Sequence, residues 1–276
     1  MHINRTTSKI IIISASLMLV NHGIAATSAV HSDDKNWTLV WADEFDTGKM
    51  LSPKFWEIAK GNGCPTLCGF GNNELQTYTA EPKNLRIEDG KLIIEAVHDD
   101  GYTSAKITTQ KMKGWQTGKI AMRAKIPAGV GTWPAFWMLP DTNSFGPWPM
   151  SGEIDIMEHV GHRLGYLHGT IHTEAFNGKM GTQKGGEVYV PTISTEFHDF
   201  AVEWTNDSLR WSIDGEQYFE ILREKTDGTA EWPFDQPFHI ILNLAVGGDW
   251  GGQKGVDENA FPTRYEIDWV KVWQQD

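Results

Sequence analysis

The feature that most constrains the fold is the recurrence of short strand-like segments separated by glycine- and proline-containing turns. Residues 85–97 are typical, because two apolar runs flank Asp89-Gly90, a dipeptide that favours a tight hairpin turn. Asp214-Gly215 repeats this signal between two later runs. The sequence shows no domain-sized helical periodicity, internal repeat or long linker. It therefore predicts an all-β protein with the architecture of a sandwich or jelly roll.

Length and charge narrow the classes of partner. The 276 residues suffice for one large domain, and they include 13 tryptophans and carry a formal net charge of -12. This acidic balance argues against nucleic acid or an anionic membrane surface, because a phosphate-binding face needs clustered lysine and arginine. A neutral ligand fits better. Tryptophans serve sugar stacking as well as core packing.

Residues 1–26 have the pattern of a secretory signal peptide. Arg5 and Lys9 precede an apolar run over residues 10–20, and small residues follow as cleavage sites. The run is shorter than the roughly 20 residues of a membrane-spanning helix. We therefore expect a secreted or periplasmic protein with no membrane attachment after cleavage. Residues 27–36 are predicted to be a flexible mature N-terminus, and residues 37–276 a single domain that is a monomer.

The chain contains two cysteines, Cys64 and Cys68, in a segment rich in glycine. In an exported chain the simplest prediction is one disulfide that closes a small loop, because the compartment permits oxidation. A free pair is the alternative. Two cysteines alone do not make a structural zinc site, which needs four ligands.

The segment Ser151-Gly-Glu-Ile-Asp-Ile-Met-Glu-His-Val-Gly161 places three carboxylates in a predicted strand. In a regular strand Glu153 and Asp155 share one face, and Glu158 falls on the other. A one-residue β-bulge around Ile156-Met157 would bring all three acids to the same face. Crowded carboxylates raise one another's pKa, so one carboxyl group can be charged while its neighbour is protonated. Retaining glycoside hydrolysis requires this division between a nucleophile and a proton donor. The alternative is a solvated acidic strand face.

A tryptophan-rich segment precedes these acids. Strand alternation places Trp133 and Trp137 on one face, and Phe136 and Met138 on the other. If the latter pair fills the interior, the two tryptophans face the groove, and Trp148 lies on the loop that enters the acidic strand. Each tryptophan alone is compatible with packing. Three that converge on a carboxylate strand are better explained as stacking platforms for pyranose rings.

These motifs resemble the laminarinase branch of glycoside hydrolase family 16. The resemblance rests on the segments Gly152-Glu-Ile-Asp-Ile-Met-Glu158, Gly131-Thr-Trp-Pro-Ala-Phe-Trp-Met-Leu-Pro140 and Gly71-Asn-Asn-Glu-Leu-Gln-Thr-Tyr78, and it extends from about Trp37 to Gln274. It implies a concanavalin A-like β-jelly-roll sandwich of two curved antiparallel sheets. It also implies a secreted endo-glucanase that hydrolyses β-1,3 bonds in laminarin-like glucans through a covalent glycosyl-enzyme.

The resemblance assigns roles to individual residues. Glu153 is expected to be the nucleophile, Glu158 the acid and base, and Asp155 the residue between them that tunes ionisation. It further implies a glucose contact for Asn73, although a turn asparagine is the simpler interpretation of that loop. His172 is expected beside the acids, bonded to the acid/base residue or to the sugar, although a lone strand histidine is more often structural.

Three further assignments come from the same resemblance. The glycine-rich loop 247–252 would bring Trp250 to the cleft rim. Lys106 stands where the family usually carries arginine, which implies a sugar contact, although lysine lacks the planar guanidinium that would fix its geometry. An exposed strand lysine with no such contact is an equal alternative. No cofactor is expected for catalysis, but a structural calcium is implied on the convex face, with ligands from Glu44, the Gly90 carbonyl and Asp268.

Other functions stay open at this stage. A non-catalytic glucan-binding or sensing protein would keep the sandwich and lose the acids, and all three acids are present here. A family 16 enzyme for mixed-linkage glucan or agarose, or a transglycosylase, would keep the same carboxylates. The acidic balance of the chain disfavours sulfated galactans, which call for basic subsites.

Overall fold

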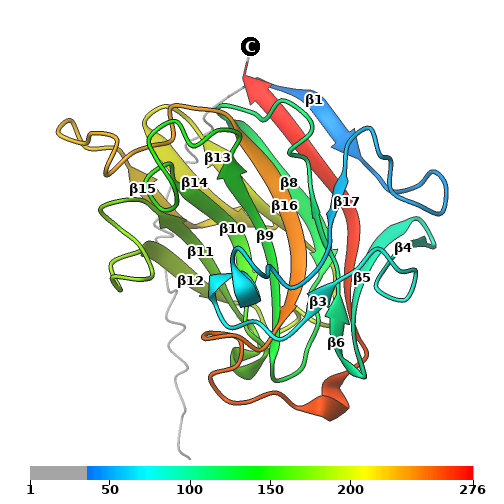
Figure 1. The fold of residues 1–276 in the computed structure, drawn as a ribbon. Helices are drawn as coiled ribbons and strands as arrows, with labels where there is room; N and C mark the ends of the chain where they lie inside the picture. The colour runs from blue at the N-terminus through cyan, green and yellow to red at the C-terminus, as the bar shows by residue number, and fades with distance from the viewer. Residues whose placement is uncertain (1–35, 276) are drawn as a thin grey trace, which may run out of the picture. The chain divides into compact units, whose positions relative to one another are not determined.

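Two antiparallel β-sheets stacked on one another contain most of the regular structure in residues 36–275, the part of the chain that the computed structural model describes (Figure 1). Within that range the helical segments are three short 3-10 turns, η1 (Cys68–Gly71), η2 (Gly161–Arg163) and η3 (Glu258–Ala260). The predicted all-β sandwich is confirmed. The predicted signal peptide, and residues 27–35 of the predicted N-terminus, lie outside the described residues.

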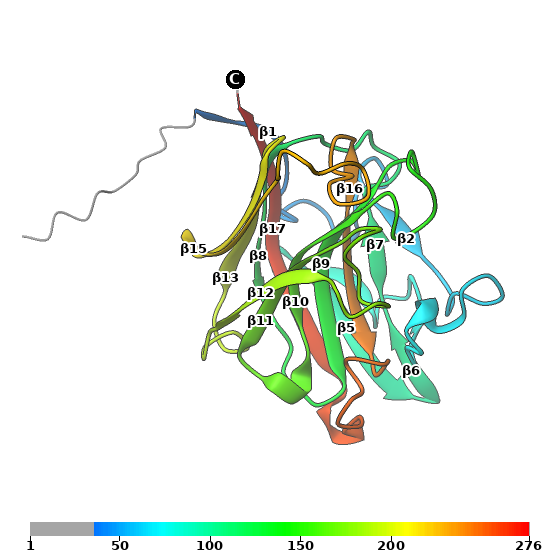
Figure 2. The same ribbon diagram turned by 90° about the vertical axis from the view of Figure 1, so that its left-hand side faces the viewer.

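One sheet has seven strands, and each neighbouring pair in it is antiparallel. Figure 2 shows this sheet stacked against the other one. In spatial order its strands are β12 (Lys184–Tyr189), β11 (Tyr166–His172), β10 (Glu153–His159), β9 (Thr132–Pro140), β16 (Phe238–Val246), β7 (Lys106–Thr108) and β2 (Glu57–Ala59).

The other sheet has ten strands. Its main path runs through β15 (Glu216–Leu222), β14 (Ser208–Ile213), β13 (His198–Trp204), β8 (Gly118–Lys125), β17 (Thr263–Gln275), β5 (Lys91–Asp99), β6 (Gly101–Ser104) and β3 (Thr77–Tyr78). Outside that path β1 (Trp37–Asp43) pairs with β17, and β4 (Leu85–Glu88) pairs with β5. Only the short β3–β6 pair is parallel among the strand pairs of the described residues.

Both predicted hairpin turns are confirmed. Asp89-Gly90 joins β4 to β5, and Asp214-Gly215 joins β14 to β15. In each turn both residues have positive φ, with values of 51° and 71° in the first and 50° and 85° in the second. That geometry matches the right-handed twist of the flanking strands, which explains why these dipeptides determine the turns.

The core lies between the two sheets and is filled from both by alternate strand residues. Phe136 and Met138 of β9 are completely buried there, and so are Ile120 and Met122 of β8. Burial of each such side chain contributes about 1.5–3 kcal/mol. The expected orientation of β9 is therefore confirmed, with Trp133 and Trp137 on the opposite face.

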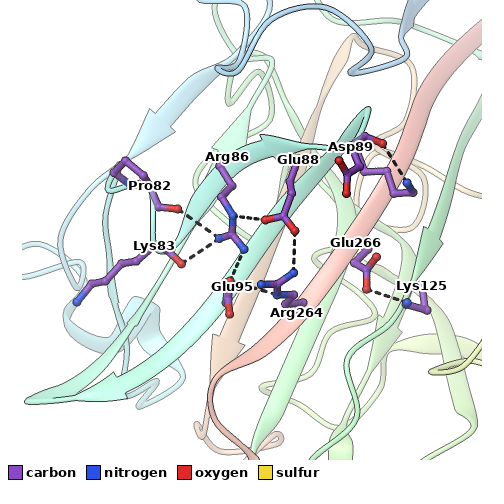
Figure 3. Close-up of polar contacts among 10 residues, drawn as sticks. Pro82, Lys83, Arg86, Glu88, Asp89, Glu95, Lys125, Arg264 and Glu266 are labelled. Carbon is purple, nitrogen blue, oxygen red and sulfur yellow. Dashed lines mark hydrogen bonds and ion pairs between the residues drawn. The ribbon is translucent and has the colours of Figure 1, made fainter.

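The outer face of the ten-stranded sheet is covered by paired charges (Figure 3). The Arg86 guanidinium lies 2.8 Å from Glu88 and 2.6 Å from Glu95, and Arg264 lies 3.0 Å from Glu88. The Arg264–Glu88 pair is exposed and contributes at most about 1 kcal/mol, whereas Glu95 is buried beneath Arg86. Glu88 and Glu95 thus have cationic partners, which distinguishes them from the three acids of β10 on the seven-stranded sheet.

The loop between β2 and β3 contains the cysteine pair. Cys64 and Cys68 are joined by a disulfide across a sequence separation of four.

Within residues 36–275, none of the helical segments has the length and hydropathy that a membrane crossing needs.

Candidate active site

The acidic strand β10 contains a β-bulge at the predicted place. On the β9 side, Asp155 pairs with Trp137 and Met157 pairs with Phe136, so Ile156 is an extra residue in β10. Ile156 and Met157 are both buried, with 2% and 1% of their surface exposed. Because of the extra residue, the two consecutive apolar side chains both enter the core. The residues after the bulge therefore point to the faces opposite to those that regular alternation would give them.

Glu158 consequently lies on the same face of the seven-stranded sheet as Glu153 and Asp155. We call this surface the acidic face. The predicted bulge and its effect on the three acids are both confirmed by the pairing of β10 with its neighbours. Carboxylate oxygens of Glu153 and Asp155 and a ring nitrogen of His172 all lie within 4.8 Å of one another.

Glu153 receives a hydrogen bond from the loop that precedes β10. The Trp148 indole Nε1 donates to its Oε2 at 2.7 Å. Lys179 in turn lies over the Trp148 ring, 4.9 Å from the centroid. Trp148 therefore lies beside the acids, as the sequence predicts, and it is a hydrogen-bond donor to Glu153 as well as an exposed ring.

Asp155 is almost completely buried, and its neighbour His172 has a fixed orientation. The Gly178 backbone N–H donates to His172 Nδ1 at 3.0 Å, so the neutral ring carries its proton on Nε2. That nitrogen lies 3.3 Å from Asp155 Oδ2 and 4.0 Å from Glu153 Oε1. His172 thus lies beside the acids as expected, and the strand register pairs it with Glu153 rather than with the acid/base residue Glu158; the expected alternative of a bond to the sugar stays a prediction.

Glu158 has its own indole donor. Trp133 Nε1 donates to its Oε1 at 3.0 Å. On the neighbouring strand β11, the residue paired with Glu158 is His168. The Trp250 ring lies edge-on to both Trp133, at 5.5 Å between centroids, and His168, at 5.0 Å. The glycine-rich loop thus brings Trp250 to the acidic face as expected.

Burial dominates the ionisation of the three acids. It raises the pKa of Glu153 to about 8, and the negative charge of Asp155 adds to this shift. Burial raises the pKa of Glu158 to about 7, whereas the Trp133 indole opposes the rise. The pKa of Asp155 lies well above its ordinary value, because of burial and then the charge of Glu158. Near neutral pH the acidic face therefore holds protons as well as charge.

Aromatic and basic side chains continue the acidic face across β9 toward β7. Trp137 Nε1 donates to Asn243 Oδ1 at 2.7 Å. The Lys106 ammonium lies over the Trp137 ring, 4.7 Å from its centroid, and 5.3 Å from that of Phe70. Burial lowers the pKa of Lys106. The alternative of an exposed strand lysine is therefore wrong for Lys106, because it packs between these rings.

A buried polar network next to Trp137 was not predicted. Gln76 Nε2 donates to Glu74 Oε2 at 2.6 Å, and Asn243 Nδ2 donates to the Tyr78 hydroxyl at 3.1 Å. The alternation of Glu74, Gln76 and Tyr78 was a usable signal, because residues two apart share a strand face.

Asn73, at φ 55°, donates to Asp249 Oδ1 at 2.9 Å, so it joins this segment to the glycine-rich loop.

The implied calcium ligands lie away from the acidic face. Asp268 occupies a bulge in β17, and the β4–β5 turn with Gly90 is adjacent because β5 pairs with β17. Glu44 lies 2.8 Å from Lys271, and Asp268 lies 3.5 Å from Arg123. Two carboxylates and a carbonyl are oxygen ligands of the type that calcium prefers, so the set fits in kind. To bind calcium, however, Glu44 would have to give up its ion pair with Lys271, and Asp268 its ion pair with Arg123.

Comparison with known proteins establishes the family. The family model described as Glycosyl hydrolases family 16 matches residues 72–271. The chain belongs to this family. It is therefore a glycoside hydrolase, and the resemblance inferred from its motifs is confirmed.

Individual relatives agree with this assignment. A β-glucanase of Rhodothermus marinus is 46% identical over 273 residues, with 95% of this chain and 94% of the relative covered. A glucan endo-1,3-β-glucosidase of Cryptopygus antarcticus is 40% identical, with 86% and 92% covered. The crystal structure of the Rhodothermus marinus laminarinase superposes with a TM-score of 0.84 at 45% identity and covers 88% of this chain and 99% of that one. The predicted β-jelly-roll sandwich is thereby confirmed.

The pKa of Glu153 makes stability depend on pH. Its pKa rises from about 4.3 in an unfolded chain to about 8 in the folded protein. Between these values the folded state binds more protons than the unfolded state, so this group destabilises the fold as pH rises. Glu153→Gln does not titrate, and we expect its Tm to exceed the parent's by about 2–4 °C at pH 8.

Differential scanning calorimetry at pH 5 and pH 8 measures this effect. The Tm difference should shrink toward pH 5, because pH 5 lies just above the unfolded pKa of about 4.3 and little of the destabilisation has accumulated there. Glu216→Gln, at an exposed position on β15, controls for the loss of one surface charge. A Tm difference that does not change with pH would contradict the burial cost assigned to Glu153.

Proposed function

We propose that this family 16 chain is a retaining endo-glucanase that hydrolyses β-1,3 bonds in laminarin-like glucans. The observation that carries the proposal is the bulge in β10, which puts Glu153 and Glu158 on one face, each with an indole donor. Among the relatives named above, the Cryptopygus antarcticus enzyme is named for β-1,3-glucan and the Rhodothermus marinus structure for laminarin, and this similarity supports the same substrate here.

In the first step Glu153 attacks the anomeric carbon and forms a glycosyl ester, while the bond to the departing oxygen breaks. Glu158 gives its proton to that oxygen. A carboxyl whose pKa is about 7 can hold a proton at neutral pH and release it to a leaving group. In the second step Glu158 takes a proton from water, which attacks the same carbon and frees Glu153.

Asp155 and His172 prepare Glu153 for this attack. The pKa of Asp155 is well above its ordinary value, so Asp155 can take up the proton that Glu153, with a pKa of about 8, holds at neutral pH. Glu153 then reacts as the carboxylate, with Trp148 Nε1 as its second donor. His172 Nε2 lies 3.3 Å from Asp155 Oδ2, where it can stabilise the charged form of this carboxyl.

The rings of the acidic face supply binding. Trp133, Trp137 and Trp250 can stack on pyranose faces, and Lys106 and Asn73 can donate to sugar hydroxyls. We further propose that the protein is exported, on the basis of the signal-peptide pattern in residues 1–26, and that it acts as a monomer.

Two single substitutions test the assignment of the carboxylates. Glu153→Gln should lower laminarin hydrolysis by at least about 10⁴-fold and keep glucan affinity, since only the nucleophile is lost. Glu158→Gln should lose laminarin hydrolysis but keep much of the first step on aryl glycosides, whose leaving groups need no proton. Reducing-sugar release and nitrophenol release measure the two effects.

The same assays decide the substrate. The parent should release reducing sugar from laminarin and little from agarose, and mixed-linkage glucan reports linkage tolerance. Binding to laminarin with no release of sugar would identify a glucan-binding protein instead. Either variant hydrolysing laminarin at the parental rate would contradict the assigned roles.

We also propose a structural calcium at Glu44, the Gly90 carbonyl and Asp268, on the strength of their adjacent positions and oxygen donors. Calcium there would tie β1 and the β4–β5 turn to β17. We expect millimolar calcium to raise Tm over a sample treated with EDTA, and Asp268→Asn to abolish most of this rise. Equal Tm values with calcium and EDTA would contradict the proposal.

A further inference from the structure

The acidic face does not end at β11, because it continues onto the edge strand β12. The register pairs His168 with Glu187 and Tyr166 with Tyr189. On β11, Leu167 and Ile171 are buried in the core, so the residues that alternate with them point to the acidic face. Register partners share a face, which places Glu187 and Tyr189 on the acidic face as well.

The opposite face of β12 packs on the other sheet and confirms this orientation. A Cβ on Gly186 would lie 2.4 Å from the Phe219 ring of β15, so this glycine lies directly against that ring. Val188 packs against the core. Glu187 and Tyr189 alternate with these two residues and therefore point away from β15.

Tyr189 and Tyr166 form an aromatic platform at the end of this surface. Their ring centroids are 5.0 Å apart with an interplanar angle of 44°, and Tyr189 is 58% exposed. Arg163 lies over the Tyr166 ring at 4.5 Å and pairs with Glu187 through two contacts of 2.9 Å and 3.3 Å. The charges of Arg163 and Glu187 cancel, so the platform combines exposed aromatic surface with a neutral polar border.

Strand geometry gives the position of the platform relative to the acids. β12 is two strands from β10, roughly 10 Å across the sheet. Tyr166 is two residues from His168, the partner of Glu158, which adds roughly 7 Å along the strands. A glucan chain lying over the acids would therefore reach the platform with a sugar ring beyond those next to the cleaved bond.

We propose that Tyr189, supported by Tyr166, is an outlying stacking site for a glucosyl unit of the chain being cleaved. The occupant is a neutral glucan because the platform is continuous with the acidic face and has no net charge to select an anionic polymer. The inference rests on the proposed function, since it takes the glucan as the substrate. Such a stacking site would make the enzyme bind and cleave long glucan chains better than short oligosaccharides.

Laminarin affinity in a Glu153→Gln background tests the site without hydrolysis. Adding Tyr189→Ala should weaken laminarin binding by about two- to tenfold, while laminaribiose, too short to span the distance, should bind unchanged. Tyr189→Phe keeps the ring and should restore laminarin affinity. Leu222→Ala, at an exposed position on β15 of the other sheet, is the control for removing surface apolar area.

Hydrolysis by the otherwise unmodified enzyme separates this inference from the proposed function. With Tyr189→Ala, kcat/KM should fall on laminarin and stay within about twofold on the shortest oligosaccharide that the parent cleaves. Unchanged laminarin binding and hydrolysis would overturn the stacking site, and so would equal losses on all chain lengths. A parent that releases no sugar from laminarin would instead overturn the proposed function.

Discussion

The site depends on one extra residue in one strand. Without Ile156 in the bulge, the apolar residues of β10 and its third carboxylate could not both have their present orientations, because strand alternation is strict. The bulge interrupts the hydrogen-bond ladder with β9 and β11. In return Ile154, Ile156 and Met157 are all buried in the core while three acids share the acidic face.

Crowding of the acids is the chemical consequence of this geometry. Three carboxyls with little solvent cannot all be ionised, so burial raises their pKa values and the site stores protons. The indoles of Trp148 and Trp133 partly offset the cost by donating to Glu153 and Glu158. The destabilising arrangement is concentrated at the proposed active site, and trade-offs between stability and activity are common at active sites.

Local rules of the sequence were enough to predict the hairpin turns, the bulge and the outward tryptophans. Each follows from residues within one strand or turn, where alternation and turn chemistry act. The family was predicted from motifs that are likewise continuous in the chain. These features needed no knowledge of which strands become neighbours.

The remaining contacts depend on register between distant segments. Lys106 packs on Trp137 because both β7 and β9 pair with β16, and His172 faces Asp155 because β11 pairs with β10 in one particular register. Neither pairing is encoded in the spacing of either strand alone. The network of Glu74, Gln76 and Tyr78 showed an alternation in the sequence, but its partner Asn243 lies 165 residues after Tyr78.

The claim that β10 aims a nucleophile and an acid at one anomeric carbon is tested most directly by trapping the intermediate. A 2-deoxy-2-fluoro laminarin-derived glycoside with a good leaving group would slow the second step, and peptide mass spectrometry would locate the attached sugar. We expect one sugar per protein, on Glu153. Attachment to Asp155 or Glu158, or hydrolysis of laminarin with inversion at the anomeric carbon, would contradict this account.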